Sequence, residues 1–575
     1  MASATNALPT EMLCQVFQNL QNHYQRFTRE GIGISRPNQP DETLFFSAPF
    51  MPSLRNERRQ FARLRLVSRT WKGVADTFMF RDIVYSIGGL ESYPDRQEHW
   101  FLANVFSRGY THLVRSIHLR PELRDDIGYP DCAPDDNAFL FEKIDLLCKL
   151  LLQRSGPRRR LFIDILPTFE TKNEGRQNGI FNRVMNALQK LPRHCEVEFS
   201  WLSWNSEKED LTTATPLLMS MNLCSLELRL TGPISFSSTF FASLRCTKKL
   251  VLNFKNERSR IGNHVKIAAD IDLMPSLEDL CVDGIPLPRV RKDLRRLCIK
   301  SPFDHFPEPD FFISVSKVNA LEDLRLSFTP MSLHYNQSTF SVTQLSEITQ
   351  AQLANLRVLQ LCTTQRVSRL LALFCSTLLR VCSSLQELKL YGLGLTDESI
   401  LGASSSSLRK LSLYGDTMTT FMAAEVHAGL AKPTEQIQWS TLCTLFQRNQ
   451  DLSEVQLDID LRLPPLTYND IENLSNSCPR LDYIKLYAKV MDDDAHDMLL
   501  RDANFAYKWN TLYSPSSPAE DKVVKRVLAY VCNDRTDDEM FTLDLKMFRR
   551  LKDGDVKGVS TSERGKKARK RRGRR

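Results

Sequence analysis

One spaced leucine pattern recurs along the chain and constrains its fold more than any other feature. The best copy is Leu385, Leu388 and Leu390, which form the frame Leu-x-x-Leu-x-Leu. Repeats with periods of roughly 20 to 50 residues are typical of arrays in which one unit cannot bury its apolar face alone. Further copies, some with Val or Ile, begin at Leu223, Leu277, Leu294, Leu321, Leu356, Leu408, Leu452 and Leu481, and a weaker copy begins at Thr247.

Each frame predicts a short strand with one buried face. Leu388 and Leu390 alternate with polar residues, which is the period of a half-buried strand. A segment between two frames has helical spacing instead, with apolar residues at Val367, Leu370, Leu371, Phe374 and Leu378. A strand followed by a helix in each unit predicts an α/β fold, a horseshoe-shaped solenoid with parallel strands inside and helices outside.

The repeated unit resembles the leucine-rich repeat. The resemblance is best at residues 382–390 and 478–486, which look like the cysteine-containing subclass of that family. Cys382 and Cys478 stand at a fixed offset before the strand, where a small buried side chain fits. The spacing between copies is irregular, and the Asn or Cys that often follows the third Leu is mostly missing, so the repeat boundaries stay open.

The N-terminal part of the chain predicts a helical module. Residues 8–20 indicate a helix entered through Pro9, because proline at the first helical position loses no needed hydrogen bond. Residues 56–80 indicate a second helix, followed by a strand at residues 80–85. In the first helix one apolar stripe is expected at Leu13, Val16, Phe17 and Leu20.

This module resembles an F-box, the helical domain that docks onto the adaptor subunit of Skp-cullin ubiquitin ligases. The resemblance lies in Leu8-Pro9-x-Glu11-x-Leu13, in residues 64–71 and in Phe80-Arg81. A proline-rich loop at residues 21–53 interrupts the family pattern. The resemblance implies adaptor contacts by Leu8, Pro9, Glu11, Leu13, Phe17, Val67 and Trp71. The alternative is that the module only caps the first repeat.

These patterns divide the chain into five parts. Residues 1–84 form the F-box-like module with its inserted loop, and residues 85–222 are degenerate N-terminal repeats with strands expected near residues 114–119 and 161–163. Regular repeats occupy residues 223–490, and a C-terminal cap is expected at residues 491–551 because an uncovered sheet end would expose the core. Residues 552–575 have almost no apolar side chains and predict a disordered basic tail.

The positive charge of the chain is concentrated in that tail. The formal net charge is +9, and residues 564–575 carry nine Lys and Arg and no acid, so 9 − 9 = 0 remains for the rest. A nucleic-acid-binding body is therefore not expected, and contact through the tail alone would be weak and salt-sensitive. The cluster Lys566, Lys567, Arg569, Lys570, Arg571 and Arg572 predicts recognition by a nuclear import receptor, and so a protein of nucleus and cytoplasm; a solubilising tail is the alternative.

Several other classes lack support in the sequence. No run approaches the roughly 18 apolar residues of a membrane-spanning helix, and residues 1–10 lack the features of a secretory signal. The fourteen cysteines are expected to be thiols. No metal or cofactor motif and no nucleophile motif occurs, so neither a cofactor nor a catalytic residue is predicted.

The resemblance implies a non-catalytic substrate receptor of a Skp-cullin-F-box ubiquitin ligase, acting in ubiquitin-dependent degradation. The adaptor would link it to a cullin, and the outward strand positions would bind an unknown protein client. These positions are Glu387, Lys389, Tyr391, Tyr414, Tyr483, Lys485 and Tyr487, with Lys410, Ser412, Glu454, Gln456 and Asp458 between them. Two alternatives remain open: a solvated face without a partner, and a nuclear leucine-rich-repeat scaffold or RNA-associated protein working without a ligase.

Overall fold

A computed structural model describes the chain in two compact units, Met1–Phe306 and Pro307–Arg575. The described residues are 10–17, 61–87, 104–121, 145, 149–150, 152, 159–163, 189–190, 196–205, 218–219, 221–231, 239–255, 271–283, 291–301, 309–328, 353–363, 369–391, 402–403, 405–414, 439–460, 466–489, 513–514, 517–520, 522–523 and 540–552. All structural statements below concern these residues.

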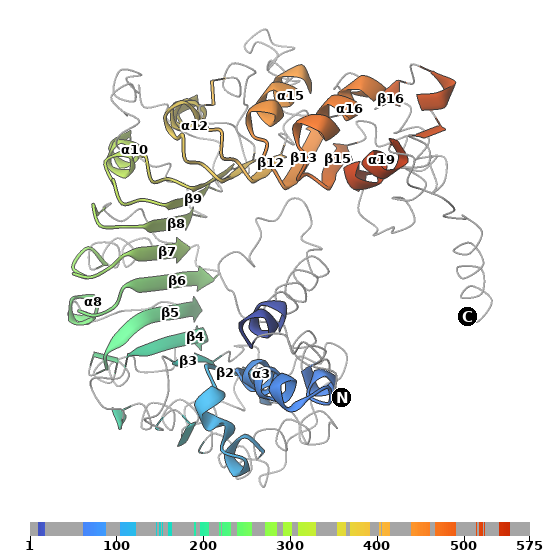
Figure 1. Cartoon of the computed structure of the whole chain (residues 1–575). Coiled ribbons are helices and arrows are strands. Elements are labelled where there is room, and N and C mark those ends of the chain that lie inside the picture. The colour runs from blue at the N-terminus through green and yellow to red at the C-terminus, as the bar shows by residue number, and fades with distance from the viewer. Residues whose placement is uncertain are drawn as a thin grey trace, which may run out of the picture. The chain divides into compact units, whose positions relative to one another are not determined.

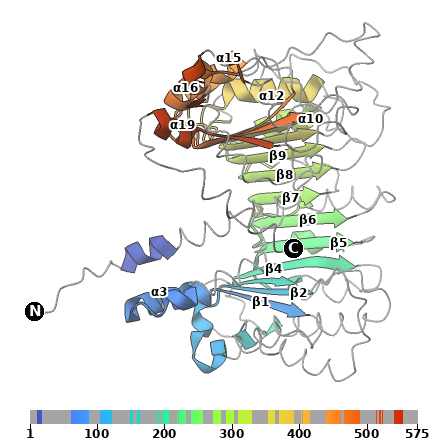
Figure 2. The ribbon, with the colours of Figure 1, turned by 90° about the vertical axis from the view of Figure 1, so that its right-hand side faces the viewer.

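The first unit is built on parallel strands that neighbour one another in chain order (Figure 2). Consecutive strands from β1 to β8 pair in parallel. The strands are β1 (Asp82–Ile87), β2 (Ser116–Pro121), β3 (Arg159–Ile163), β4 (Val197–Asn205), β5 (Leu223–Thr231), β6 (Lys249–Lys255), β7 (Asp279–Asp283) and β8 (Arg296–Ser301). The helices of this unit with assigned bounds are α3 (Arg69–Met79), the 3-10 helix η2 (Tyr110–Leu113) and α8 (Phe240–Ser243).

The second unit repeats the arrangement and then reverses direction. Its strands are β9 (Asp323–Phe328), β10 (Val358–Thr363), β11 (Glu387–Tyr391), β12 (Lys410–Tyr414), β13 (Glu454–Asp460), β15 (Tyr483–Lys489) and β17 (Met540–Asp544). Pairing is parallel up to β15 and antiparallel between β15 and β17. A separate two-stranded ladder joins β14 (Leu466–Thr467) to β16 (Tyr513–Ser514). The helices are α10 (Pro309–Ser316), α12 (Arg369–Val381), α15 (Trp439–Arg448), α16 (Tyr468–Ser477) and α19 (Leu545–Lys552), and α12, α15 and α16 lie on one side of the strands (Figure 1).

The leucine frame forms the strands and the core, as predicted. Leu388 on β11 is in register with Leu411 on β12, which is in register with Val455 on β13, and all three side chains are buried. The first leucine of the frame, such as Leu385, precedes the strand and is buried as well. The expectation of an α/β array of parallel strands in chain order, with helices between them, is therefore confirmed within each unit.

A backbone contact repeats where the chain enters several strands, among them β7, β8, β10, β11, β12 and β13. The N–H groups of Gln386 and Glu387 both donate to the carbonyl oxygen of Arg357, at 2.7 and 2.9 Å. One unit further, Arg409 and Lys410 donate to the carbonyl oxygen of Gln386, at 2.7 and 3.0 Å. One carbonyl oxygen can accept two bonds because it has two lone pairs, so a carbonyl of the preceding repeat satisfies both N–H donors at the start of the next strand. This contact sets the register between consecutive units.

Buried polar side chains form further links between consecutive repeats. Thr247 stands where other copies have the first leucine, and its hydroxyl donates to the carbonyl oxygen of Leu223 at 2.9 Å. Asn449 donates through Nδ2 to the carbonyl oxygen of Leu445 at 2.8 Å and accepts from the N–H of Leu408 at 2.9 Å. Both side chains are fully buried. Hydrogen bonding makes this burial tolerable, which explains why the frame accepts Thr247.

The single helix predicted over residues 56–80 is wrong. Within the described residues a helical turn at 61–64 ends in a turn at 65–67, and α3 begins at Arg69. Ser68 has an extended backbone, and its hydroxyl accepts the N–H of Trp71 at 3.2 Å. The side chain of a serine can bond to the backbone in place of the helical hydrogen bond, so serine is disfavoured inside a helix and favoured at its N-cap. Ser68 therefore begins a new helix. The loop predicted at residues 21–53 lies outside the described residues.

The degenerate repeats contain the expected strands and one more. β2 and β3 overlap the segments predicted near residues 114–119 and 161–163, and β1 overlaps the strand predicted at residues 80–85, at the end of the N-terminal module. The additional strand, β4, continues the order between β3 and β5. Its sequence alternates Val197, Phe199 and Trp201 with Glu198 and Ser200. That alternation is the signal of a strand, even though the leucine frame is absent.

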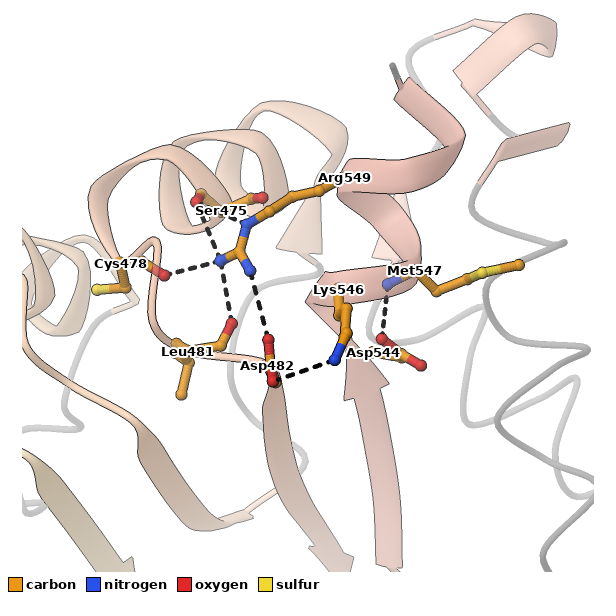
Figure 3. A network of polar contacts seen from close by, with 8 residues as sticks. All are labelled: Ser475, Cys478, Leu481, Asp482, Asp544, Lys546, Met547 and Arg549. Carbon is orange, nitrogen blue, oxygen red and sulfur yellow. Dashed lines mark hydrogen bonds and ion pairs between the residues drawn. The ribbon is translucent and has the colours of Figure 1, made fainter. Parts of the chain in front are cut away.

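The C-terminal helix α19 is attached to the last parallel repeat by Arg549 (Figure 3). The Arg549 guanidinium donates through Nη2 to the carbonyl oxygens of Ser475, Cys478 and Leu481, at 3.2, 2.7 and 3.0 Å. Nε of Arg549 also donates to Ser475, at 3.2 Å. These carbonyls lie at and after the end of α16, where helix carbonyls have no partner within the helix. Arg549 of α19 thus caps the C-terminal end of α16.

Candidate interaction surfaces

The described part of the N-terminal module is organised around Phe17. Its ring stacks on Phe61 with 5.5 Å between centroids and on Phe78 with 5.7 Å. Trp71 contacts the same ring edge-on at 5.8 Å. Leu13, one turn earlier, is also buried. The helix at residues 10–17 is therefore fixed to α3 by an aromatic cluster, and such pairs add about 0.5–1.5 kcal/mol each beyond burial.

This cluster changes the interpretation of the adaptor residues predicted from the sequence. Leu13 and Phe17 are at most 1 % exposed, so their side chains hold the module together and have no surface for a partner. Trp71 is half-buried beside Phe17, whereas Glu11 and Val67 are exposed. Direct adaptor contact through Leu13 and Phe17 stays a prediction, and in this structure both side chains pack inside the module. Leu8 and Pro9 lie outside the described residues.

Other apolar side chains of the module are exposed. Met12 is 50 % exposed and Val16 is 41 % exposed, and they stand four residues apart on one helix. Leu66 and Val67, in the turn before α3, are 86 % and 60 % exposed. Neighbouring exposed apolar residues of this size are characteristic of sites that bind another protein. Sequence reasoning assigned Val16 to the buried stripe and missed Met12 and Leu66; the i, i+4 pair of Met12 and Val16 was the available signal.

A buried ion pair joins the turn to α3. Arg65 Nε lies 2.5 Å from Asp76 Oδ1, and Asp76 is almost fully buried. The guanidinium of Arg65 also lies over the Phe80 ring, at 5.9 Å from its centroid. Phe80 in turn stacks on Tyr110 of η2, with 4.4 Å between centroids. The turn that carries Leu66 is therefore held by charge and ring contacts that extend into the repeats of the same unit.

The outward strand positions of the second unit form rows across the sheet. The register places Glu387 beside Lys410 and Lys410 beside Glu454. The next row is Gln360, Lys389, Ser412, Gln456 and Lys485, and a further row contains Tyr391, Tyr414, Asp458 and Tyr487. All the residues predicted to bind a client lie on described strands, in positions that alternate with the buried leucines. Tyr483 is the first residue of β15 and extends the row of Glu387, Lys410 and Glu454, because the next residue, Ile484, pairs with Val455.

Charged side chains of this face pair with one another. Lys410 Nζ lies 3.5 Å from Glu454 Oε2, and these side chains are 49 % and 46 % exposed. Gln456 donates to Glu454 Oε1 at 3.4 Å. Arg325 Nε lies 2.8 Å from Asp323 Oδ1, and both of these side chains are mostly buried. Of these two ion pairs, the one between β12 and β13 is therefore accessible and the one on β9 is mostly buried.

The corresponding face of the first unit has a different character. Val251, Cys281 and Cys298 are in register on β6, β7 and β8, and all three are buried. Glu227, beside Val251 on β5, is buried too. Burial raises the pKa of the Cys281 thiol well above its ordinary value, and the adjacent Cys298 thiol adds to the shift. A row of small, water-excluded side chains offers a partner little to bind.

Metal and membrane sites find no support in the described part of the chain. No group of three or more His, Cys, Asp or Glu side chains there could hold a metal ion. Among the same residues, every helix is too short or too polar to cross a bilayer. The basic residues Lys566, Lys567, Arg569, Lys570, Arg571 and Arg572 lie outside the described residues.

Comparison with known proteins adds no identity. No protein-family model matches the chain, and no curated protein matches it significantly. Within the described residues, two surfaces are suited to binding another molecule: the exposed apolar residues of the N-terminal module and the polar strand face of the second unit.

Proposed function

We propose that this chain is the substrate-recognition subunit of a Skp-cullin-F-box ubiquitin ligase, with an F-box at its N-terminus and leucine-rich repeats after it. The N-terminal module docks the adaptor, and the strand face of the second unit binds the client protein. The chain makes and breaks no bond itself. It raises the local concentration of a client lysine near the conjugating enzyme that the ligase recruits.

The observation that carries the proposal is the division of apolar residues in the N-terminal module. Leu13 and Phe17 fill an aromatic cluster, while Met12, Val16 and Leu66 remain exposed. A module that only capped the repeats would bury its apolar residues against them. Apolar surface that persists on a well-packed module favours a second protein as its partner.

The strand face supports the second half of the proposal. Lys410, Glu454 and Tyr483 combine both charge signs with an aromatic ring, and each is close to half exposed. Mixed charge with tyrosine is typical of surfaces that bind proteins and is unsuited to a polyanion, because Glu454 would repel phosphates. This composition favours a protein client over RNA.

The adaptor half is tested by binding of the full-length chain to purified Skp-type adaptor. In one variant Met12→Glu is combined with Val16→Glu, and in another Leu66→Glu is combined with Val67→Glu. The matched control is Leu273→Glu, because Leu273 is 54 % exposed in the same unit but outside the module. Each double variant is expected to weaken adaptor binding at least tenfold, since a buried carboxylate in the interface costs more than about 1.4 kcal/mol.

The control is expected to bind as the unchanged chain does. Adaptor binding that survives both double variants would move the docking surface elsewhere. An unchanged chain that does not bind the adaptor at all would overturn the ligase assignment. The Leu8→Ala/Pro9→Ala variant distinguishes a ligase receptor from a nuclear scaffold. A ligase receptor would lose adaptor binding in this variant, whereas a nuclear scaffold would keep its partners.

A further inference from the structure

Three accessible side chains form one row across the second unit, on β12, β13 and β15. Lys410 and Glu454 are registered neighbours, and Tyr483 stands next to Glu454 because the following residues, Val455 and Ile484, are paired. Their side chains are 49 %, 46 % and, for the whole residue, 47 % exposed. Read from β12 to β15, the row presents a cation, an anion and an aromatic ring.

The spacing of this row selects the kind of chain that can follow it. Neighbouring strands lie about 4.8 Å apart, so the row extends over about 9.6 Å. An extended peptide places same-side residues about 6.8 Å apart, and three of them span about 13.6 Å. A helix places successive residues of one face about 5–6 Å apart, and three of them span about 11 Å. The helix mismatch is about 1 Å, whereas the extended chain is wrong by about 4 Å.

We propose that this row binds an amphipathic helix of the client protein, laid across the strands. The helix carries an acidic residue at position i against Lys410, a basic residue at i+4 against Glu454, and an apolar residue at i+7 against Tyr483. This assignment rests on the proposed function, because it specifies the client of the same surface. Lys410 and Glu454 already form an ion pair at 3.5 Å. The acidic and basic residues of the docked helix lie beside this pair, which gives a network of four charges of alternating sign.

The surroundings of the row agree with a helical partner of mixed charge. Glu387 flanks Lys410 on β11, so a purely acidic partner would meet repulsion on that side. Arg480 and Asp451 form an exposed pair at 2.8 Å in the turns just before β15 and β13. Charges of both signs along the rim determine the orientation and register of a bound helix more than its affinity. Such a surface can discriminate between helices that are equally hydrophobic.

The test uses two helical peptides of equal composition and the full-length chain. Both are alanine-based and about 21 residues long, with Leu at i+7; one carries Glu at i and Lys at i+4, and the other carries these two residues exchanged. Binding is measured by fluorescence anisotropy. The unchanged chain is expected to prefer the first peptide by about fivefold, the effect of two exposed ion pairs. The double variant Lys410→Glu/Glu454→Lys keeps its internal ion pair and is expected to prefer the second peptide.

The decisive result is the reversal of the peptide preference in the double variant. The two peptides differ in helix stability, but this difference is the same for both proteins and cannot reverse the preference. Tyr483→Ala is expected to weaken both peptides about equally, with no change in preference. Equal affinity of the unchanged chain for the two peptides, a preference that does not reverse in the double variant, or no binding at about 1 mM peptide would each overturn the inference. Adaptor binding, measured on the same preparations, is independent of these outcomes, so a failed helix site and a failed ligase assignment are distinguished.

Discussion

At the scale of single residues, Arg549 shows how one side chain can close a repeat array. It donates to three backbone carbonyls from α19 while its Nη1 lies 3.9 Å from Asp482 Oδ1 (Figure 3). The side chain is only 25 % exposed, so water cannot easily replace these bonds. A hydrogen-bond donor that is removed here leaves buried acceptors without a partner, which costs more than the bond itself contributes.

We therefore expect Arg549→Met to destabilise the C-terminal end of the second unit by roughly 2–4 kcal/mol, because the Ser475 and Leu481 carbonyls lose the Arg549 donor. The Cys478 carbonyl keeps its hydrogen bond from the Leu481 N–H. Hydrogen exchange of the amides in residues 540–552 is the measurement, because local opening of α19 accelerates it. The matched control is Arg480→Met. Arg480 pairs with Asp451 at 2.8 Å but is 67 % exposed, so a change below about 0.5 kcal/mol is expected. Equal effects of the two substitutions would contradict the role assigned to Arg549.

The burial of two thiols predicts slow alkylation of these cysteines and a stability of the fold that depends on pH. Burial raises the pKa of Cys382 to about 12 and that of Cys478 to about 11, from an ordinary value of 9.0. In the unfolded chain these thiols ionise near pH 9, whereas in the folded chain they stay protonated. The folded state is thus favoured below pH 9, and this contribution is lost as the pH rises from about 9 through 11 to 12.

Two measurements check this expectation. Iodoacetamide at pH 8 is expected to modify the exposed Cys14 and Cys246 while Cys382 and Cys478 react only after denaturation, as read by peptide mass spectrometry. The melting temperature is expected to fall between pH 9 and 11. In the Cys382→Ala/Cys478→Ala variant that fall should be smaller, and an identical slope in both proteins would argue against thiol ionisation as the cause.

The residue scale is also where sequence reasoning reached its limit at the N-terminal module. Spacing placed Leu13, Val16 and Phe17 on one stripe, but the helix buries Leu13 and Phe17 and exposes Val16. A hydrophobic pattern tells which residues avoid water, and it does not tell which of them the fold itself covers. That choice depends on Phe61 and Phe78, which come from more than 40 residues away and meet Phe17 only in three dimensions.

At the scale of elements, the strands that carry the leucine frame were predictable, whereas β4, which lacks the frame, and the helix boundaries were not. The frame beginning at Leu385 predicted β11, and the frame beginning at Leu481 predicted β15. Strand position followed from a period of two that any local stretch displays. The start of α3 followed instead from one side chain, Ser68, within a segment whose apolar spacing continues through it. Capping competes with periodicity, and here capping determined the boundary.

The cap of α3 gives a prediction at this scale. Ser68→Ala removes the acceptor for the Trp71 N–H and is expected to destabilise the N-terminal module by about 1 kcal/mol. Ser68→Asp retains an acceptor and is expected to be within about 0.5 kcal/mol of the unchanged chain. Trp71 fluorescence during urea unfolding is a suitable measurement, with the five other tryptophans changed to phenylalanine in a common background. Equal losses in both variants would mean that the hydroxyl is not the cap.

At the scale of the whole molecule, the proposed functions occupy separate parts of the chain. The exposed apolar residues belong to the first unit, and the mixed-charge row belongs to the second. Adaptor binding and client binding should therefore be lost independently. A ligase reconstituted with the Met12→Glu/Val16→Glu chain is expected to retain peptide binding while losing ubiquitin transfer to a tethered client.

The basic residues near the C-terminus supply the last prediction. Deletion of residues 564–575 removes nine positive charges. We expect nuclear accumulation of a fluorescently labelled chain to fall to the level of passive entry, while adaptor binding in vitro is unchanged. Replacing the six clustered basic residues by glutamine is the matched control for chain length. A deletion that leaves nuclear accumulation intact would assign the tail to solubility.

The antiparallel strand β17 bears on how such a chain could change its length over evolutionary time. Tandem duplication lengthens a repeat protein when the copy can pair with its neighbour as the original did. A parallel unit added after β17 would meet a strand that runs the opposite way. Duplicated parallel units are therefore accommodated before β17 and not after it. The repeat next to β17 should accordingly be among the oldest of the array.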